Sequence, residues 1–402
     1  MFAPGGFLLL LGLIAPVVLG QFVPFNQSGF LFAYELDETD LATISLSFPD
    51  CQNGPLAGNI VCTASANYRD RTWGLINLLT IDELIVNTRN TAPGVPRLGL
   101  PPYQVWNEAL HRLDQANFSD FVTFSRATIF AQPILSTAAL NRTFIHTIAD
   151  IISTQGRALK NAGKYGEDAF FLTSAYAYEY ITALQGGVEP DYIKIVATPR
   201  RFAGYDLESW NGTSRLSNDL IISNQDLAGY YTPQFKAAIR DARANSFMCS
   251  YNGVNGVPSC ANSYLLQTLL RNTWGFSNYD GYVSADCDSV VNVWEPHYYA
   301  YNLSVASSES LLAGTDIDCG HAYAVHLNES IIAGAVAPSD IAQGVFRLYS
   351  NLVRLGFFDW NNSVVYRELT WEDVVSTDAQ NISYESAVQG ITLLKNDGTL
   401  PL

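Results

Sequence analysis

Asp286 is the residue whose position in this sequence most clearly suits chemistry. It follows directly on residues 281–285, a short apolar segment that we expect to form a buried strand. In a parallel α/β barrel the C-terminal ends of the strands form the active face, so a carboxylate at such an end is well placed for catalysis. A second expected strand, residues 247–251, ends at Tyr251 and Asn252, which should lie on the same face. The alternative for a lone aspartate is a helix cap or a loop carboxylate.

Other kinds of catalytic site find less support in the sequence. Ser284 lacks the Gly-x-Ser-x-Gly setting of a serine hydrolase. Asp316 and Asp318 lack the spacing of a calcium loop, and we expect them to brace the site rather than to react. No metal ion or cofactor is expected, because the histidines are scattered; they are His111, His146, His297, His321 and His326. Asp286 therefore remains the main candidate.

The elements that must position Asp286 alternate between strands and helices. A further strand is predicted over residues 192–198, and helices are predicted over residues 136–160, 168–184, 226–244, 263–271 and 384–395. Repeated strand–helix units imply parallel strands joined by crossover helices. The length of 402 residues then favours a (β/α)8 barrel over an open doubly wound sheet. No Gly-x-Gly-x-x-Gly follows an expected strand, which argues against a dinucleotide-binding fold.

The composition is that of an acidic globular protein. Asp and Glu outnumber Lys and Arg by 38 to 22, which gives a formal net charge of −16. This balance argues against nucleic acid or an anionic membrane as a partner, because both require basic patches. Hydrophobic residues make up 48% of the chain and charged residues 15%, which excludes a disordered protein.

Export from the cell is predicted by two features. Residues 1–20 contain an apolar run that is shorter than the roughly 20 residues needed to span a bilayer and that ends in small residues, as a cleaved secretory signal does. Gln21 is then the expected mature N-terminus. Eight Asn-x-Ser/Thr sequons predict a secreted, extracellular glycoprotein; they begin at Asn26, Asn117, Asn141, Asn211, Asn302, Asn328, Asn361 and Asn381.

The six cysteines are even in number, as expected of disulfides in a secreted protein. Two pairs are close in the sequence and leave a third, so the expected disulfides are Cys51–Cys62, Cys249–Cys260 and Cys287–Cys319. Zinc is the rival interpretation, but the chain has neither a Cys-x-x-Cys motif nor a histidine cluster.

A series of short motifs is spread in order over most of the chain. They lie at residues 103–111 (YQVWNEALH), 202–208 (FAGYDLE), 231–235 (YTPQF), 248–260, 274–276 (WGF), 313–319 (AGTDIDC) and 390–402. Together they resemble glycoside hydrolase family 3, and most closely its secreted fungal β-xylosidase branch.

The resemblance implies a retaining β-glycosidase that releases xylose from the non-reducing ends of β-1,4-xylo-oligosaccharides. Asp286 matches the nucleophile, which would form a covalent glycosyl-enzyme that water then hydrolyses. Glu108 matches a carboxylate that holds sugar hydroxyls, and Tyr251 would donate a hydrogen bond to Asp286. Cys287 stands where the family's glucosidases usually carry Trp, which makes a β-glucosidase the weaker alternative.

The chain also departs from the family pattern. Arg200 and Arg201 replace the Lys and His of a sugar-binding Lys-His-Phe motif; they keep positive charge near Asp286 but crowd the pocket. Near residue 166 a strand and loop with a sugar-binding arginine are missing, so the (β/α)8 barrel of residues 21–375 is expected to be incomplete. The family's general acid/base lies in a second, α/β sandwich domain, to which residues 376–402 would form the junction helix and linker.

These departures keep another hypothesis open, a catalytically impaired sugar-binding fragment or an incomplete gene model. A retaining glycosidase requires two carboxyl groups about 5–5.5 Å apart. The loop 203–210 contains no histidine to act as general acid/base, and Asp206 and Asp288 are weaker candidates. We therefore expect the general acid/base to lie outside this chain and the chain alone to show little or no hydrolysis.

Overall fold

The computed structural model describes residues 48–105, 108–113, 127–161, 168–169, 174–359 and 364–400. The expected signal of residues 1–20 lies outside these ranges, and so do the sequons at Asn26, Asn117 and Asn361. The same holds for residues 162–167, on which the expected loss of a strand falls.

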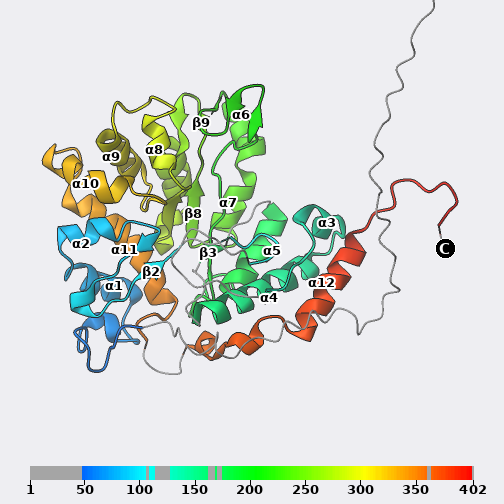
Figure 1. Cartoon of the computed structure of the whole chain (residues 1–402), viewed down its shortest axis with the longest axis horizontal. Helices are drawn as coiled ribbons and strands as arrows, with labels where there is room; N and C mark the ends of the chain where they lie inside the picture. Colours follow the sequence, from blue (N-terminus) through cyan, green and yellow to red (C-terminus); the bar gives the residue numbers. More distant parts are fainter. Residues whose placement is uncertain are drawn as a thin grey trace, which may run out of the picture.

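Parallel strands occupy the centre of the molecule, with helices around them (Figure 1). β11 (Tyr282–Ala285) pairs in parallel with β8 (Ser246–Cys249), and β3 (Asp168–Ala169) pairs in parallel with β4 (Val196–Ala197). Every residue of β8 and β11 is buried, as expected of parallel strands that are covered on both faces. The fold is therefore α/β and resembles a (β/α)8 barrel.

Isolated parallel bridges add further segments beside β8 and β11. Phe202 pairs with Cys249 at the end of β8, and Ile317 pairs with Ser284 in β11. Arg89 pairs in turn with Asp318. Side by side, the paired segments are therefore Arg89, residues 317–318, β11, β8 and Phe202. β11 is the central segment of the five, so the residues that follow it lie between the others.

The helices cover the outside of this order. The α-helices are α1 (Tyr68–Ile76), α2 (Ile81–Val86), α3 (Pro133–Ala138), α4 (Arg142–Asn161), α5 (Ser174–Gln185), α6 (Asn224–Asp226), α7 (Pro233–Arg240), α8 (Ser289–Trp294), α9 (Leu303–Ala313), α10 (Ala322–Ile332), α11 (Pro338–Arg354) and α12 (Thr377–Gly390). Wider, π-type turns form Leu227–Tyr231 and Tyr264–Thr273. The remaining short strands are β1 (Thr91–Ala92), β2 (Tyr103–Gln104), β5 (Ser209–Trp210), β6 (Thr213–Ser214), β7 (Asp219–Leu220), β9 (Gly253–Val254) and β10 (Val257–Pro258).

Several predicted helices have different bounds in the structure. The helix expected over residues 136–160 is divided into α3 and α4, because Leu140 adopts a positive φ of 51° between them. Of the helix expected over residues 168–184, residues 168–169 pair with β4 instead, and Ser174 onward forms α5. The last helix begins at Thr377 rather than at residue 384, since Ser376 caps it by accepting a hydrogen bond from the Ala379 backbone N–H.

A buried charge cluster braces β11 from below the active face. Asp316 is 1% exposed, and its Oδ2 accepts hydrogen bonds from Arg271 Nη2 at 2.5 Å and from the Val283 backbone N–H at 2.7 Å. Its Oδ1 accepts a hydrogen bond from Arg347 Nη1 at 2.5 Å. This confirms the expected bracing role of Asp316, because the carboxylate ties β11 to the neighbouring segment at residues 316–318.

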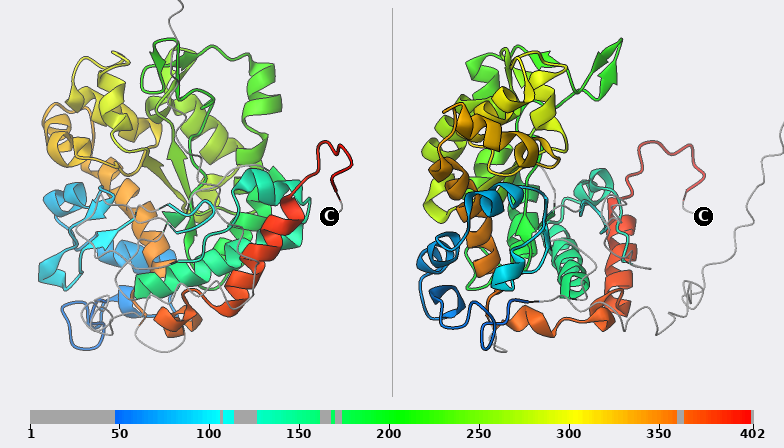
Figure 2. Two further views of the ribbon diagram at one scale, coloured as in Figure 1. Left: turned by 45° about the vertical axis from the view of Figure 1, so that its right-hand side comes forward. Right: turned by 60° about the vertical axis from the view of Figure 1, so that its left-hand side comes forward.

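The three disulfides join the expected pairs, which are Cys51–Cys62, Cys249–Cys260 and Cys287–Cys319. Of the sequon asparagines that the structure describes, Asn211, Asn302, Asn328 and Asn381 are exposed and Asn141 is half-buried. Asn211 lies in the turn of the β5–β6 hairpin, which projects from the body of the molecule (Figure 2). None of the helices in the described ranges is long and apolar enough to cross a membrane.

Helix α12 packs along the outside of α4 and against α3 (Figures 1 and 2). The contact at its end is close: a Cβ added to Gly390 would lie 2.2 Å from the backbone oxygen of Leu135. The segment that we expect to be a junction helix is thus attached to the helical layer around the strands.

Candidate active site

A cavity of about 890 Å³ lies where the parallel strands end. Every site residue that we predict from the sequence lines it, namely Glu108, Arg200, Arg201, Tyr251, Asp286 and Cys287. These residues come from separate segments that follow β2, β4, β8 and β11. The shared C-terminal edge of parallel strands brings them together, as in other barrels.

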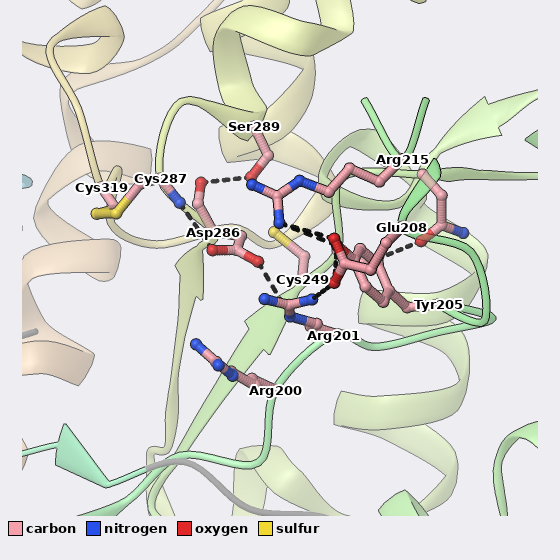
Figure 3. Close-up of polar contacts among 12 residues, drawn as sticks. Arg200, Arg201, Tyr205, Glu208, Arg215, Cys249, Asp286, Cys287, Ser289 and Cys319 are labelled. Carbon is pink, nitrogen blue, oxygen red and sulfur yellow. Dashed lines mark hydrogen bonds and ion pairs between the residues drawn. A yellow bond between two sulfur atoms is a disulfide. The ribbon is translucent and has the colours of Figure 1, made fainter. Parts of the chain in front are cut away.

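Asp286 lies at the floor of this cavity and is 5% exposed. Its Oδ1 accepts a hydrogen bond from the Cys287 backbone N–H at 3.0 Å (Figure 3). Its Oδ2 is 3.7 Å from Arg201 Nε, an ion pair too long to be a hydrogen bond. Burial raises the pKa of Asp286, and the charges of Arg201 and Arg200 oppose that rise.

Arg201 connects Asp286 to a second carboxylate on the neighbouring loop. Its Nη1 donates a hydrogen bond to Glu208 Oε1 at 2.8 Å, and its guanidinium carbon lies 4.2 Å from the centre of the Tyr205 ring (Figure 3). The backbone of Arg201 has a positive φ of 69°. This conformation is uncommon for a residue with a side chain, and here it accompanies a guanidinium that is turned toward Asp286.

Glu208 is bound by more than one cation. Arg215 Nη1 donates to Glu208 Oε2 at 3.0 Å, and the Tyr205 hydroxyl donates to Oε1 at 3.0 Å. Burial raises the pKa of Glu208, but the hydrogen bonds from Arg201 and Tyr205 outweigh it and lower the pKa below its usual value. Glu208 is therefore an anion that holds the two arginines in place rather than a proton donor.

Glu108 and Arg200 form a second ion pair at the wall of the cavity, between Arg200 Nη1 and Glu108 Oε1. The side chains are 22% and 25% exposed respectively. Burial raises the pKa of Glu108, and the charge and hydrogen bond of Arg200 work against that rise. A ligand hydroxyl that binds Glu108 must therefore share it with Arg200.

Tyr251 also lines the cavity, and the guanidinium carbon of Arg215 lies 4.8 Å from the centroid of its ring. Burial and then the charge of Asp286 raise the pKa of the Tyr251 hydroxyl, so it stays protonated. A hydrogen bond from the Tyr251 side chain, as expected from the sequence, is among the influences that lower the pKa of Asp286. Asp286 Oδ2 has no hydrogen-bond partner of ordinary geometry among the described residues.

One expectation about neighbouring residues is wrong, and one weak candidate lies outside the cavity lining. Asn252 is buried and donates from Nδ2 to the Ala203 backbone oxygen at 3.1 Å, so it supports the loop outside the cavity lining. Asp206 is exposed and interacts with Tyr231 instead of lining the cavity.

The structure also adds lining residues that sequence reasoning missed. They are Arg89 after α2, His321 shortly after the segment at residues 317–318, and Arg215 directly after β6. Arg89 follows α2 and carries no recognisable motif. Its parallel bridge with Asp318 is the feature that places it at the active edge. Asp288, named from the sequence only as a weak candidate, lines the cavity.

Comparison with known families identifies the central part of the chain. Residues 140–350 match the model of the glycosyl hydrolase family 3 N terminal domain. The chain is 58% identical over 392 residues to the "Probable exo-1,4-beta-xylosidase xlnD" of Aspergillus fumigatus, covering 92% of this chain and 49% of the relative. It is 53% identical over 424 residues to the "Exo-1,4-beta-xylosidase xlnD" of Aspergillus niger, covering 98% of this chain and 52% of the relative.

Solved structures agree with this assignment. A "GH3 exo-beta-xylosidase (XlnD) in complex with xylobiose aziridine activity based probe" matches with a TM-score of 0.84 and 55% identity, over 89% of this chain and 49% of that chain. A β-glucosidase of Erythrobacter marinus matches with a TM-score of 0.73 over 86% of this chain and 53% of that chain; at 21% identity it supports the fold alone.

Two features of these matches concern the segments that we expect this chain to lack relative to the family. The chain spans about half the length of the curated relatives it matches. The alignment with a relative of Aspergillus japonicus runs over 427 positions, more than the 402 residues of this chain, so that relative has residues without counterparts here. The family model, the relatives and the solved structure agree, and the chain belongs to glycosyl hydrolase family 3.

Proposed function

We propose that this chain is the barrel part of a retaining exo-β-xylosidase that removes xylose from the non-reducing ends of β-1,4-xylo-oligosaccharides. The observation that carries the proposal is the position of Asp286, a buried carboxylate at the end of β11 on the floor of a cavity of about 890 Å³. The identity of 53–58% to exo-1,4-β-xylosidases over most of the chain supports the choice of a xyloside.

In the proposed reaction Asp286 Oδ2 attacks the anomeric carbon of the terminal xylose. The bond from Oδ2 to this carbon forms while the bond to the leaving oxygen breaks, and a general acid protonates that oxygen. In the second step the same general acid/base takes a proton from water, the water oxygen bonds to the anomeric carbon, and the bond to Oδ2 breaks, which releases xylose and restores the carboxylate. Oδ2 suits the attack because it lacks a hydrogen-bond partner among the described residues, whereas Oδ1 is held by the Cys287 N–H.

The remaining site residues have proposed roles in binding. Glu108 would accept hydrogen bonds from sugar hydroxyls, and Arg200 would orient Glu108 through their ion pair. Cys287 and its disulfide partner Cys319 form a wall of the cavity. A pentose lacks the hydroxymethyl arm of a hexose, so this wall would select by bulk.

The general acid/base is proposed to come from a second domain beyond the barrel. We propose residues 21–375 as the barrel domain and residues 376–402 as the junction, with α12 as its helix. Glu208 is a poor general acid, because Arg201 and Tyr205 keep it ionised. Secretion and N-glycosylation at the sequons belong to the same proposal.

The direct test is release of the phenol from dinitrophenyl β-xyloside and β-glucoside by the purified protein and by Asp286→Asn. So good a leaving group departs without a general acid, so the first equivalent of phenol reports attack by Asp286 although the general acid/base is proposed to lie outside this chain. Phenol release from the xyloside that is lost in Asp286→Asn supports the proposal. Preference for the glucoside would contradict the choice of substrate. Release that persists in Asp286→Asn would contradict the assigned nucleophile.

A second candidate function, sugar binding without turnover, is favoured by the contacts of the two arginines. Arg200 occupies Glu108, and Arg201 lies 3.7 Å from the proposed nucleophile. Xylobiose binding measured by calorimetry, together with no release of phenol from either dinitrophenyl glycoside, would favour this function over the first.

A further inference from the structure

Guanidinium groups are concentrated in the candidate active site of a strongly acidic protein. The chain has a net charge of −16, yet four arginines and no lysine are among the described residues that line the cavity. They are Arg89, Arg200, Arg201 and Arg215. A neutral pentose offers hydroxyl groups alone, so its recognition does not account for four full positive charges.

Three of these arginines are engaged by carboxylates of the protein. Arg200 pairs with Glu108, while Arg201 and Arg215 share Glu208. With the additional ion pair between Arg201 and Asp286, these three arginines face three carboxylates within the site.

Arg89 differs from the other three. Its side chain forms no ion pair or hydrogen bond with the residues that the structure describes, and its Nε, like that of Arg201, is buried without a hydrogen-bond partner among them. It lies close enough to Asp318 to help lower the pKa of that carboxyl, but the two do not form an ion pair within the described ranges. A buried donor without an acceptor is costly, which favours a ligand that supplies one.

Arg89 also stands at a defined place relative to Asp286. Arg89 pairs with Asp318, whose neighbour Ile317 pairs with β11, whereas Arg201 precedes Phe202, which pairs with the end of β8. The two arginines thus lie on opposite sides of Asp286 in the strand order. If the anomeric carbon of a bound xylose faces Asp286, a substituent on that xylose or the next sugar unit would extend toward Arg89.

We propose that the cavity prefers xylo-oligosaccharides that carry a carboxylate, and that Arg89 binds this carboxylate. The chemistry is that of a guanidinium fork, which matches a carboxylate in a bidentate manner. The carboxylate has two possible sources, a uronic acid unit or an oxidised, aldonic end. This inference rests on the proposed function and narrows its substrate class.

The test compares three disaccharides by calorimetry at low ionic strength. They are xylobiose, xylobionate and glucuronosyl-xylose, and all are titrated into the Asp286→Asn protein so that none is consumed. We expect one of the two acidic disaccharides to bind about tenfold more tightly than xylobiose, as one charge-assisted pair allows. The acidic ligand that binds identifies the source of the carboxylate.

Arg89→Gln in the same background should remove this preference and leave xylobiose affinity within about twofold, because only the charged pair is lost. Arg240→Gln, which changes an exposed arginine paired with Asp241, is the matched control and should leave all three affinities unchanged. Equal affinity for neutral and acidic disaccharides, or a preference that survives Arg89→Gln, would overturn the inference. Xylobiose binding without a preference would leave the proposed function intact, whereas no binding of any disaccharide would count against both.

A salt titration keeps the inference testable if Arg89→Gln does not fold. Added salt should weaken binding of the acidic disaccharide and leave xylobiose affinity unchanged, because salt screens only the charged contact. An equal response of the two ligands would contradict the inference.

Discussion

The guanidinium of Arg201 pairs with two carboxylates, that of Asp286 and that of Glu208. Its Nε lies 3.7 Å from Asp286 Oδ2, while its Nη1 donates to Glu208 Oε1 at 2.8 Å (Figure 3). The shorter contact goes to the more exposed carboxylate, whose side chain is 63% exposed against 7% for Asp286. Arg201 therefore supplies positive charge to Asp286 without covering Oδ2 by a hydrogen bond.

Arg201→Gln should move the acidic limb of the activity profile to higher pH. Burial raises the pKa of Asp286 and Arg201 is the largest opposing influence, so its loss raises that pKa further. Since the nucleophile must be ionised, activity should then require a higher pH. The measurement is kcat/KM against pH on an aryl xyloside, with the exposed Arg240→Gln as control; an unshifted limb would contradict this account of Arg201.

Glu108→Gln should weaken sugar binding with little effect on folding. The variant loses the charge that pairs with Arg200, but both side chains are about a quarter exposed, so the stability change should stay below about 1 kcal/mol. We expect xylobiose to bind about tenfold more weakly, as for loss of a charged hydrogen bond. Calorimetry measures the xylobiose affinity, and thermal unfolding measures the stability. Unchanged affinity would show that Glu108 does not bind the sugar.

Asp316→Asn should be strongly destabilising. The carboxylate is 1% exposed and is bound by Arg271 and Arg347, and Arg271 is itself 1% exposed. Removal of one partner from such a buried group costs about 3–5 kcal/mol. Urea unfolding measures the loss, and Asp241→Asn at the exposed pair with Arg240 should change stability by less than about 0.5 kcal/mol. Similar effects of the two variants would contradict a bracing role.

Asp318→Asn should stabilise the protein at neutral pH and have little effect near pH 4. Burial raises the pKa of Asp318 from 3.8 to about 6, so the native state binds this proton more tightly than the unfolded chain does. The resulting stability is fully present below the unfolded pKa and is lost as pH rises through the folded pKa. The variant escapes this loss, which is on the order of 3 kcal/mol above pH 6.

Urea unfolding of wild type and Asp318→Asn across this pH range measures the difference directly. The amide oxygen of the variant can still accept from the Tyr323 backbone N–H, which lies 3.3 Å from Oδ2 in the wild type. A difference in unfolding free energy that stays constant with pH would show that Asp318 does not titrate in this range.

The site was predictable where one residue follows a strongly apolar strand. Val283 and its neighbours in β11 are all buried, so the end of the strand and Asp286 could be located from sequence pattern. Tyr251 could be located in the same way, because it follows the fully buried strand β8. Glu108, Arg200 and Arg201 came from the family resemblance, because their segments contain strands too short to give a periodic signal.

The site residues and helix bounds that could not be predicted depend on contacts between residues far apart in the sequence. Arg89 reaches the cavity through a single bridge to Asp318, more than two hundred residues along the chain. The break at Leu140 and the pairing of residues 168–169 with β4 likewise override a helical pattern.

Covalent trapping of Asp286 tests the central claim most directly. A xylobiose-derived aziridine, which reacts with a glycosidase nucleophile, is incubated with the protein, and the labelled peptide is identified by mass spectrometry. We predict one label, on Asp286, that is absent from Asp286→Asn and is prevented by excess xylobiose. A label on another residue, or labelling that persists in Asp286→Asn, would contradict the assignment of Asp286 as the nucleophile.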